Sequence, residues 1–430
     1  MRAARLAFPA LLALAACDGA SGTFTVSLVT APGSQVLDNV VTARLVLSAP
    51  RTVVESSRAA DGSFALSLDV DASGAAGTLL FEGVDTSGAI LAVGETPPLP
   101  IAAVDAAIRI YVAAPRSFAA APVALTAPRA EVATASLAYG ELIAGGVDSS
   151  GAASADVVIY NAYTHDFQVG VPLPAARAGA SAFGGTSGAV YLFGGDDPAG
   201  APTSTFWRYD TTVAPAGAVT ALATSDALAR TGAATAAIGS DRALVTGAPP
   251  ALLDGLGGAA SALPAPAPAA IGGAIAPLSI SNQLAVIFTG AAAGSTGVTL
   301  YTTTGFSELA APDDARRTGH GLAVTGLATA VLVGGGVAGS PLTPDLLVVN
   351  AEARAVSSVP GVLLTPRRDA AIALTGDLIV VAGGTDESGN VLGDAELIDV
   401  TTLSRSAVIP LTAPRTGAIA RVLPSGQVLL

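Results

Sequence analysis

A glycine-rich pattern that recurs along the chain constrains the fold more than any other feature. Three copies read G-G-x-D-x-x-G and begin at Gly145, Gly194 and Gly383. Each copy follows a short apolar run and precedes a second run of strand-like composition, so the pattern predicts a tight turn between two β-strands. Weaker glycine clusters lie around Gly247, Gly290 and Gly334-Gly335-Gly336. Recurrence of one strand–turn–strand unit predicts a repeat architecture.

An arginine precedes most of these units. The arginines are Arg129, Arg177, Arg230, Arg317, Arg367 and Arg415. Successive members are 48, 53, 87, 50 and 48 residues apart. The longest interval accommodates two units in which one arginine is missing. The repeat period is therefore about 50 residues, the length of one blade in some β-propellers.

An arginine, an apolar strand, a diglycine and a second apolar strand ending near Tyr160 or Tyr209 resemble the kelch repeat. The resemblance covers about 310 residues and implies an all-β fold, with a kelch-type β-propeller over residues 123–430. Six complete blades and an incomplete seventh are expected. The unit from Leu253 to Leu309 departs most from the pattern, and the closing tryptophan of the family is mostly missing, because Trp207 is the only tryptophan.

The seventh unit is expected to stop after its second strand. In the strong copies the first glycine follows its arginine by 16 or 17 residues, which puts the next diglycine one residue beyond Leu430. Two alternatives remain open. Either the chain is truncated, or residues near 118–125 supply an outer strand to the last blade. An unpaired sheet edge at this position would favour aggregation.

Residues 17–114 are predicted to form a small immunoglobulin-like β-sandwich, and residues 115–122 a linker. Seven short alternating runs occur in about ninety residues, separated by turn residues such as Asp61-Gly62. The runs are Thr23 to Val29, Thr42 to Leu47, Thr52 to Glu55, Ser63 to Val70, Thr78 to Val84, Ala89 to Val93 and Ala107 to Val112.

Residues 1–16 have the layout of a secretory signal peptide, with two arginines ahead of an apolar run too short to span a bilayer. The run ends in Leu14-Ala15-Ala16-Cys17, which resembles the bacterial lipobox. The resemblance implies cleavage before Cys17 and a lipid on its thiol, and hence a cell-envelope protein anchored to a bacterial membrane. The alternative is an ordinary signal peptide followed by a chance cysteine.

Charge and residue counts exclude several classes of partner and site. The net charge is −13, which opposes binding to a phosphate backbone, so no nucleic-acid partner is predicted. One cysteine cannot form an internal disulfide, and two unclustered histidines offer little to zinc. We therefore predict no metal site and no cofactor.

The candidate ligand-binding face comprises Arg129, Arg177, Arg367, Asp148, Asp197 and Asp386. In a four-stranded antiparallel blade, the turn before the first strand and the turn after the second strand lie at the same end. The arginines and the aspartates of the glycine turns should therefore share one end, where they could hold a sugar or peptide. The structural alternative is that the aspartates cap turns and the arginines tie them down. Calcium held by the three aspartate loops is a weaker alternative, because each loop offers few ligands.

Catalytic interpretations are poorly supported. A copper site like that of galactose oxidase, a kelch-type enzyme, would need more histidines than His165, expected in an exposed turn, and His320. An activity like that of kelch-type sialic-acid epimerases would depend on Glu131 or Glu387, neither of which stands in a recognisable motif. We therefore predict a non-catalytic protein that binds a protein or carbohydrate partner. The alternatives are a carbohydrate-active enzyme and a purely architectural role.

Overall fold

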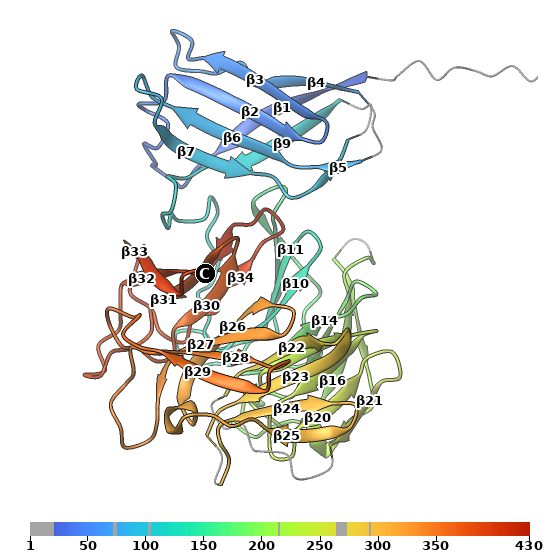
Figure 1. Cartoon of the computed structure of the whole chain (residues 1–430). Coiled ribbons are helices and arrows are strands. Elements are labelled where there is room, and N and C mark those ends of the chain that lie inside the picture. Colours follow the sequence, from blue (N-terminus) through green and yellow to red (C-terminus); the bar gives the residue numbers. More distant parts are fainter. Residues whose placement is uncertain (1–20, 72–74, 102–104, 214–215, 264–272, 292–293) are drawn as a thin grey trace, which may run out of the picture.

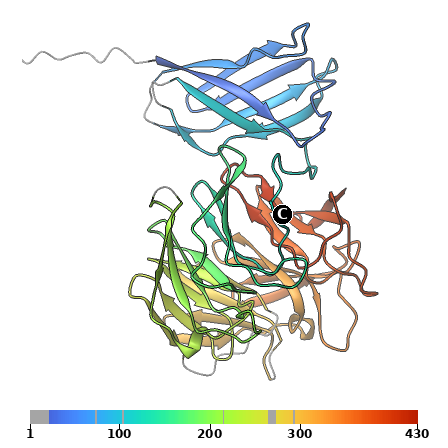
Figure 2. The same ribbon diagram turned by 180° about the vertical axis from the view of Figure 1, so that it is seen from behind.

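The computed structural model describes residues 21–71, 75–101, 105–213, 216–263, 273–291 and 294–430. These residues form an all-β chain with two bodies, an N-terminal one and a larger one that contains the repeats (Figures 1 and 2). The only helices among them are two 3₁₀ turns, η1 (Asp226–Leu228) and η2 (Asp313–Ala315). The predicted signal peptide and Cys17 lie outside the described residues.

The N-terminal body consists of two sheets that enclose one apolar core. One sheet has the order β3-β2-β6-β7 and the other β4-β1-β9, with β1 and β9 parallel. The strands are β1 (Ser21–Val29), β2 (Thr42–Ser48), β3 (Arg51–Ser57), β4 (Ser67–Asp71), β6 (Leu79–Val84), β7 (Ile90–Glu95) and β9 (Ala106–Tyr111), with the short pair β5 (Ala76–Gly77) and β8 (Leu99–Pro100).

All seven strands predicted for this body are present. Buried positions alternate along β2 and β4, which puts Leu45 and Leu68 into a core shared with Phe81 and Ile110. The alternation arises because successive side chains of a strand point to opposite faces, and only one face of each sheet is covered. The predicted fourth run, from Ser63, is longer than the observed strand, which begins at Ser67.

The described part of the repeat region contains six consecutive four-stranded antiparallel sheets, each formed by strands adjacent in sequence. The first three are β10 (Ala133–Leu137), β11 (Gly140–Ala144), β12 (Val157–Asn161) and β13 (Asp166–Val169); β14 (Ser181–Gly184), β15 (Ala189–Phe193), β16 (Phe206–Asp210) and β17 (Ala218–Ala221); and β18 (Thr235–Gly239), β19 (Arg242–Val245), β20 (Ala251–Asp254) and β21 (Ala259–Ala262).

The other three are β22 (Ile275–Ile280), β23 (Gln283–Thr289), β24 (Val298–Thr302) and β25 (Gly305–Glu308); β26 (Thr318–Gly326), β27 (Thr329–Gly336), β28 (Leu346–Asn350) and β29 (Ala355–Val359); and β30 (Ala371–Thr375), β31 (Leu378–Ala382), β32 (Asp394–Asp399) and β33 (Ser404–Pro410). Two complete sheets, the third and the fourth, lie between Arg230 and Arg317. The long interval between these arginines therefore holds two units, as predicted.

Each sheet packs on the next through apolar side chains. Leu192 and Trp207 of the second sheet share a cluster with Ile159 of the first, and five such clusters join the six described sheets in order. The first strands of consecutive sheets also contact one another, from β10 through β14, β18, β22 and β26 to β30. The second strands are buried on both faces, which explains their continuous apolar sequences.

Backbone hydrogen bonds join neighbouring sheets at each diglycine turn, an arrangement we call the joint. Between the first two sheets, Gly146 N–H donates to the carbonyl of Arg177 (2.8 Å), and Gly179 N–H donates to the carbonyl of Glu131 (2.9 Å). The first bond recurs as Gly195 to Arg230, Gly335 to Arg367 and Gly384 to Arg415, and the second as Gly232 to Gly179, Asp369 to Gly319 and Gly417 to Asp369.

The joint explains why two glycines are required. Gly145 and Gly146 have φ angles of 65° and 91°, which residues with a side chain rarely adopt. A Cβ on Gly145 would lie 2.7 Å from the carbonyl oxygen of Arg177 in the next sheet, and one on Gly146 would lie 2.5 Å from that of Ala130. Both glycines therefore permit backbone contacts that a larger residue would block.

A two-stranded sheet, β34 (Arg421–Val422) and β35 (Val428–Leu429), follows the sixth sheet. It contacts both ends of the series, because Val428 packs against a cluster of the sixth sheet and Leu429 against a cluster of the first. The expectation of two strands in the seventh unit is confirmed. Residues 118–125 form no strand, so the alternative that they supply one is wrong, although Phe118 packs on the sixth-sheet cluster.

The turn between β12 and β13 makes hydrogen bonds between the two bodies. The ring nitrogen Nε2 of His165 accepts a hydrogen bond from Tyr111 N–H (3.1 Å), and Tyr163 Oη donates to the carbonyl of Pro98 (2.7 Å). His165 lies in the predicted turn, but the prediction that it is exposed is wrong, since only 1% of it is accessible. Tyr111 and Tyr160 cover it.

Replacing Gly383 with alanine should destabilise the fold by about 3 kcal/mol, because the new Cβ would lie 2.2 Å from the carbonyl oxygen of Arg415 at a residue with φ of 63°. Gly389→Ala is the matched control. Its φ is 81° and no atom lies within 4 Å of its Cβ position, so only the conformational cost of about 1 kcal/mol remains. Urea unfolding followed by Trp207 fluorescence measures both. Equal losses would show that the close approach is unimportant.

Candidate functional site: the arginines and aspartates of the glycine turns

The three aspartates of the candidate face organise exposed hairpin loops. Oδ1 of Asp148 accepts hydrogen bonds from Ser150 N–H (2.8 Å), Ser150 Oγ (2.6 Å) and Ala152 N–H (3.1 Å). Asp197 and Asp386 accept the corresponding backbone bonds from residues two and four positions later. This is the aspartate-capped turn that the structural interpretation predicts.

These hydrogen bonds also keep the aspartates ionised. The Ser150 hydroxyl, followed by the backbone donors, lowers the pKa of Asp148, and the Asn390 side chain does the same for Asp386. The N–H groups of Ala201 and Ala199 lower the pKa of Asp197. Among the described residues, Oδ2 of Asp148 and of Asp197 has no hydrogen-bond donor, whereas Oδ2 of Asp386 accepts from Asn390 (2.9 Å). Two carboxylates therefore keep an available acceptor oxygen.

The arginines lie beside the same turns. This agrees with the prediction that the turn before the first strand and the turn after the second strand lie at the same end of a sheet. Arg129 Nη1 donates to the carbonyl of Gly145 and to that of Asp156, each at 3.0 Å. Bridges between Ala130 and Val147, and between Arg368 and Thr385, hold each arginine segment against its own glycine turn. The side chains point inward to backbone carbonyls and so stabilise the turn that carries the aspartate.

Arg177 is also covered. It is 6% exposed, its guanidinium lies 5.0 Å from the centre of the Trp207 ring, and Nη1 donates to the carbonyl of Ala176 (2.7 Å). Burial lowers the pKa of this guanidinium, and the nearby Asp197 carboxylate partly offsets that effect. Trp207 therefore packs as a core residue that also supports a repeat arginine.

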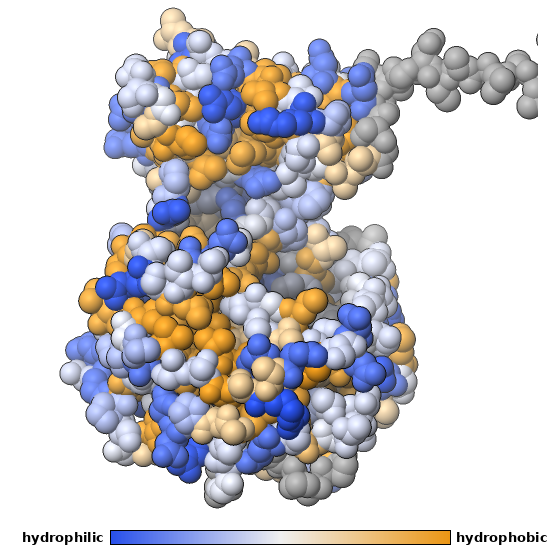
Figure 3. All heavy atoms as spheres, in the orientation of Figure 1, coloured by the Kyte–Doolittle hydropathy of each residue, from blue (hydrophilic) through white to orange (hydrophobic). Residues whose placement is uncertain are grey.

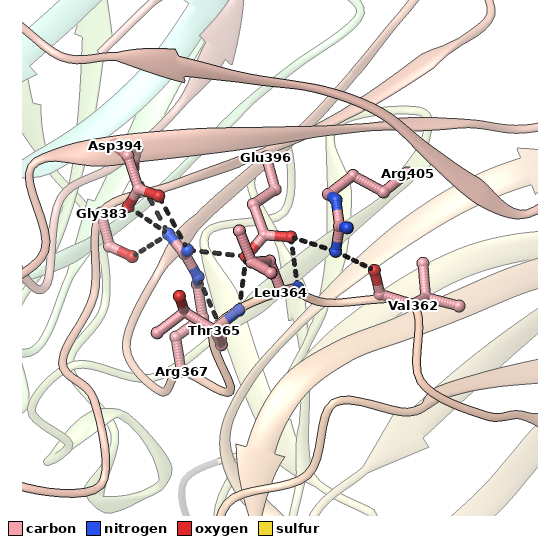
Figure 4. Close-up of polar contacts among 8 residues, drawn as sticks. All are labelled: Val362, Leu364, Thr365, Arg367, Gly383, Asp394, Glu396 and Arg405. Carbon is pink, nitrogen blue, oxygen red and sulfur yellow. Dashed lines mark hydrogen bonds and ion pairs between the residues drawn. The ribbon is translucent and has the colours of Figure 1, made fainter.

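Arg367 has the most extensive set of partners (Figure 4). Its Nη2 donates to Glu396 Oε1 (2.7 Å), and its Nη1 donates to the carbonyl of Gly383 (3.1 Å) and to Asp394 Oδ1 (3.2 Å). Glu396 in turn accepts from the N–H groups of Leu364 (2.7 Å) and Thr365 (3.0 Å). Arg367 and Glu396 are both fully buried. Each charge therefore has an opposite charge and further hydrogen-bond partners within the protein, which offset the cost of removing it from water.

The structure thus divides the six candidate residues into two groups. Asp148, Asp197 and Asp386 lie in loops at the surface, whereas Arg177 and Arg367 are buried and Arg129 is directed to carbonyl oxygens. Arg129 and Arg367 bond to the carbonyl of the first glycine of their turns, whereas Arg177 packs on Trp207. Ligand contact by the aspartates remains a prediction, and the buried arginines would act on a ligand only through loop position.

The two glutamates weighed as catalytic groups have structural contacts. Oε2 of Glu387 accepts the N–H of Leu342 (2.6 Å), which links the loop of the sixth sheet to that of the fifth. Glu131 has φ of 54° and contributes its carbonyl to the joint with Gly179. Neither contact indicates a proton-transfer role.

Three buried charged groups were not anticipated from the sequence. They are Glu396, Asp241, which accepts hydrogen bonds from Thr186, Ser187 and Tyr191, and Glu141, which pairs with Arg421 (3.2 Å). A carboxylate between two apolar residues, as Glu396 is between Ala395 and Leu397, is the signal that could have revealed the first. Within the described ranges, no three His, Cys, Asp or Glu side chains are grouped so that they could hold a metal ion. No helix in the described segments is long and apolar enough to cross a membrane.

Arg367→Ala should lower the free energy of unfolding by about 3–5 kcal/mol, because it leaves the buried Glu396 without its main counter-charge. Arg368→Ala is the control, since Arg368 is exposed and its contact with Asp369 is 4.0 Å long; its loss should cost less than about 0.5 kcal/mol. Urea denaturation gives both values. If the two variants were equally stable, the network around Arg367 would not be structural.

Lowering the pH should reduce the free energy of unfolding, because two histidines are buried. Burial, followed by the nearby positive charge of Arg317, lowers the pKa of His320 to about 4, and burial lowers that of His165. The unfolded chain then binds protons first, near the ordinary pKa of about 6.5, so stability falls as pH decreases below that value. For His320 the expected loss is about 2 kcal/mol between pH 7.5 and 5.

The test of this pH dependence is a series of urea titrations on His320→Gln and on the unchanged chain. The variant should lose most of the slope between pH 7.5 and 5, a range above the ordinary pKa of Asp and Glu side chains. His165→Gln should remove a further part. A slope that survives in the double variant would assign the effect to other groups.

Comparison with known proteins adds no family assignment. The sequence matches no protein-family model. A search of the curated proteins likewise finds no match. The resemblance to the kelch repeat therefore rests on this chain's own features, which are the spacing of its arginines, its diglycine turns and its consecutive four-stranded sheets.

Proposed function

We propose that residues 123–430 form a kelch-type β-propeller in which the six four-stranded sheets and the two-stranded sheet are the blades. Three observations support this proposal. Consecutive sheets share apolar clusters, their first strands contact one another in order, and the two-stranded sheet contacts both the sixth and the first sheet. Radial repetition of this kind leaves only short sheet edges.

We further propose that the protein is a lipid-anchored component of the bacterial cell envelope and that its propeller binds a protein or carbohydrate partner without catalysis. The lipobox-like sequence ending at Cys17 supports the anchor. The N-terminal body, for which an immunoglobulin-like sandwich is proposed, would then separate the propeller from the membrane.

The aspartate loops are the observation that carries the binding role. Backbone joints fix the base of each loop, Arg129 and Arg367 bond to the turns of two of them, and the tips stay exposed with ionised carboxylates. Binding residues are commonly found on loops that a rigid scaffold holds in place. Carboxylate oxygens accept hydrogen bonds from sugar hydroxyls and from peptide N–H groups, so either partner class suits these loops.

The experiment has two arms. In the first, the full chain is expressed in a bacterium with labelled palmitate. The protein should carry the label, and the Cys17→Ala variant should not. In the second, the chain from Asp18 onward is screened against envelope proteins and a glycan array. Simultaneous alanine substitution of Asp148, Asp197 and Asp386 should weaken the binding found by about tenfold or more.

Asp85→Ala provides a matched control for the second arm. Asp85 makes the same kind of turn in the N-terminal body, with Oδ1 accepting from Ser87 and Ala89. Its loss should leave binding unchanged. A screen that recovers no partner, or turnover of a sugar by the purified chain, would contradict the proposed binding role.

A further inference from the structure

The connection between the N-terminal body and the repeat region is narrow. In the space-filling view a waist separates the two bodies (Figure 3). Among the described residues, Tyr163 is the one side chain of the repeat region that packs on the N-terminal apolar cluster. Two domains of one chain are expected to move relative to each other unless their interface is large and hydrophobic. The polar contacts at the waist therefore contribute much of what holds the two bodies together.

The turn between β12 and β13 holds His165 in one position at this waist. The side chain of Asn161 accepts the N–H groups of Tyr163 (2.9 Å) and Thr164 (3.3 Å). The carbonyl of Asn161 accepts the N–H of His165 (2.8 Å). Because the turn closes on itself in this way, the imidazole is aimed at the N-terminal body by its own backbone and not by the contact that it makes there.

The imidazole covers the free edge of β9. Strand β1 pairs with β9 on one side, and on the other side Tyr111 N–H donates to Nε2 of His165 (3.1 Å). The ring is 1% exposed, so water cannot readily replace it as the acceptor. A buried backbone N–H that loses its acceptor is costly, and this bond therefore holds β9 against the turn.

The hydrogen bonds of the ring fix its protonation state. An uncharged imidazole carries one ring proton, and since Nε2 accepts, the proton lies on Nδ1. Nδ1 then donates to Oη of Tyr160 (3.3 Å). A second proton, on Nε2, would face the N–H of Tyr111 and replace the hydrogen bond with a contact between two donors. The geometry of the waist therefore suits the uncharged ring alone.

The groups around the ring come from both bodies. Burial, more than any other cause, lowers the pKa of His165, and the positive charge of Arg109 on β9 acts in the same direction. The backbone of Arg109 and the carboxylate of Asp166 act in the opposite direction. Burial raises the pKa of Tyr111, and raises that of Tyr160 to about 12, so neither phenol contributes to a response near neutral pH.

The remaining contacts at the waist do not involve the ring. Tyr163 Oη donates to the carbonyl of Pro98 (2.7 Å), and Nη1 of Arg109 donates to the carbonyl of Thr164 (3.3 Å). Nε2 of the uncharged Gln427 donates to the carbonyl of Tyr111 (3.3 Å). Since all three acceptors are backbone carbonyls, which do not titrate near neutral pH, loss of the His165 bond is the step that can respond to acid.

We propose that His165 is a pH-sensitive latch, which holds the N-terminal body to the repeat region while uncharged and releases it when protonated, with both bodies still folded. The inference goes beyond the proposed function and does not depend on a partner. Once released, the ring is in water and has the ordinary histidine pKa of about 6.5. The released form therefore takes up a proton first, and its population relative to the docked form rises as pH falls below that value.

Energy transfer between two dyes, one on each body, measures the release. Cys17 is the only cysteine, so the chain from Asp18 onward can be labelled at two introduced positions. Thr86→Cys in the β6–β7 turn and Leu256→Cys in the β20–β21 turn lie at exposed residues. The population of the released form should rise by about tenfold between pH 6.5 and 5. Trp207 fluorescence and circular dichroism of the unlabelled chain should stay native over this range.

Three variants separate the latch from other causes. His165→Gln keeps an acceptor for Tyr111 but cannot be protonated, so it should stay docked at pH 5. His320→Gln is the matched control, because it removes the other histidine of the chain, in the fifth sheet, and should open as the unchanged chain does. Tyr163→Phe removes a contact that does not titrate, so it should open at a higher pH and still respond to acid.

The ring itself gives a second measurement. With nitrogen-15 in both histidines, the chain gives two sets of ring signals in magnetic resonance spectra, which His320→Gln assigns. Nε2 of His165 should show the shift of an unprotonated acceptor at pH 7.5, and its protonation should have the same midpoint as the change in energy transfer.

Several results would overturn the inference. They are protonation of His165 without a change in energy transfer, acid opening of His165→Gln at the midpoint of the unchanged chain, and loss of the native Trp207 signal at that midpoint. The last result would mean that acid unfolds the repeat region and does not release it. Each of these measurements is made without a partner, so failure of the latch leaves the proposed binding role untouched.

Discussion

The close approach of backbones at the diglycine turns is the contact on which the repeat region depends. At each joint one glycine N–H reaches the carbonyl of the next repeat arginine, and a residue two positions after that arginine returns a second bond. These bonds fix how far apart two sheets lie at one end, and the apolar clusters fill the space that remains. Because the contact is made by main chain, it recurs although side chains elsewhere in the units vary.

The third and fourth sheets show what replaces this contact when the diglycine is lost. Thr246 and Thr289 occupy the place of the first glycine, and each hydroxyl bonds to the backbone of the residue just before the first strand of its own sheet, Ala234 and Ala274. Thr289 Oγ1 also lies 2.7 Å from Nε2 of His320 in the fifth sheet. A side-chain contact therefore joins the fourth sheet to the fifth, which accounts for the burial of His320, and the replacement of glycine by threonine makes this part of the sequence resemble the other repeats only weakly.

Periodicity was enough to predict the sheets but not the direction of the long side chains. The arginine-to-glycine spacing located six complete units and the two-strand seventh, because spacing reports where the chain turns. It did not reveal that Arg367 is fully covered, since a guanidinium at the start of a strand can reach solvent or turn inward to carbonyl oxygens. The inward direction depends on Glu396, a partner 29 residues later in β32, and the sequence alone does not show that the two side chains meet. Exposure of His165 was mispredicted for the same reason, because Tyr111 of the other body covers it.

The junction between the seventh sheet and the first is built differently from the joints. Arg421 of β34 donates to Glu141 Oε1 (3.2 Å) and to Thr134 Oγ1 (2.8 Å), so side chains make this connection. Burial raises the pKa of Glu141, and its second oxygen has no donor among the described residues, which makes the pair costly to keep inside the protein.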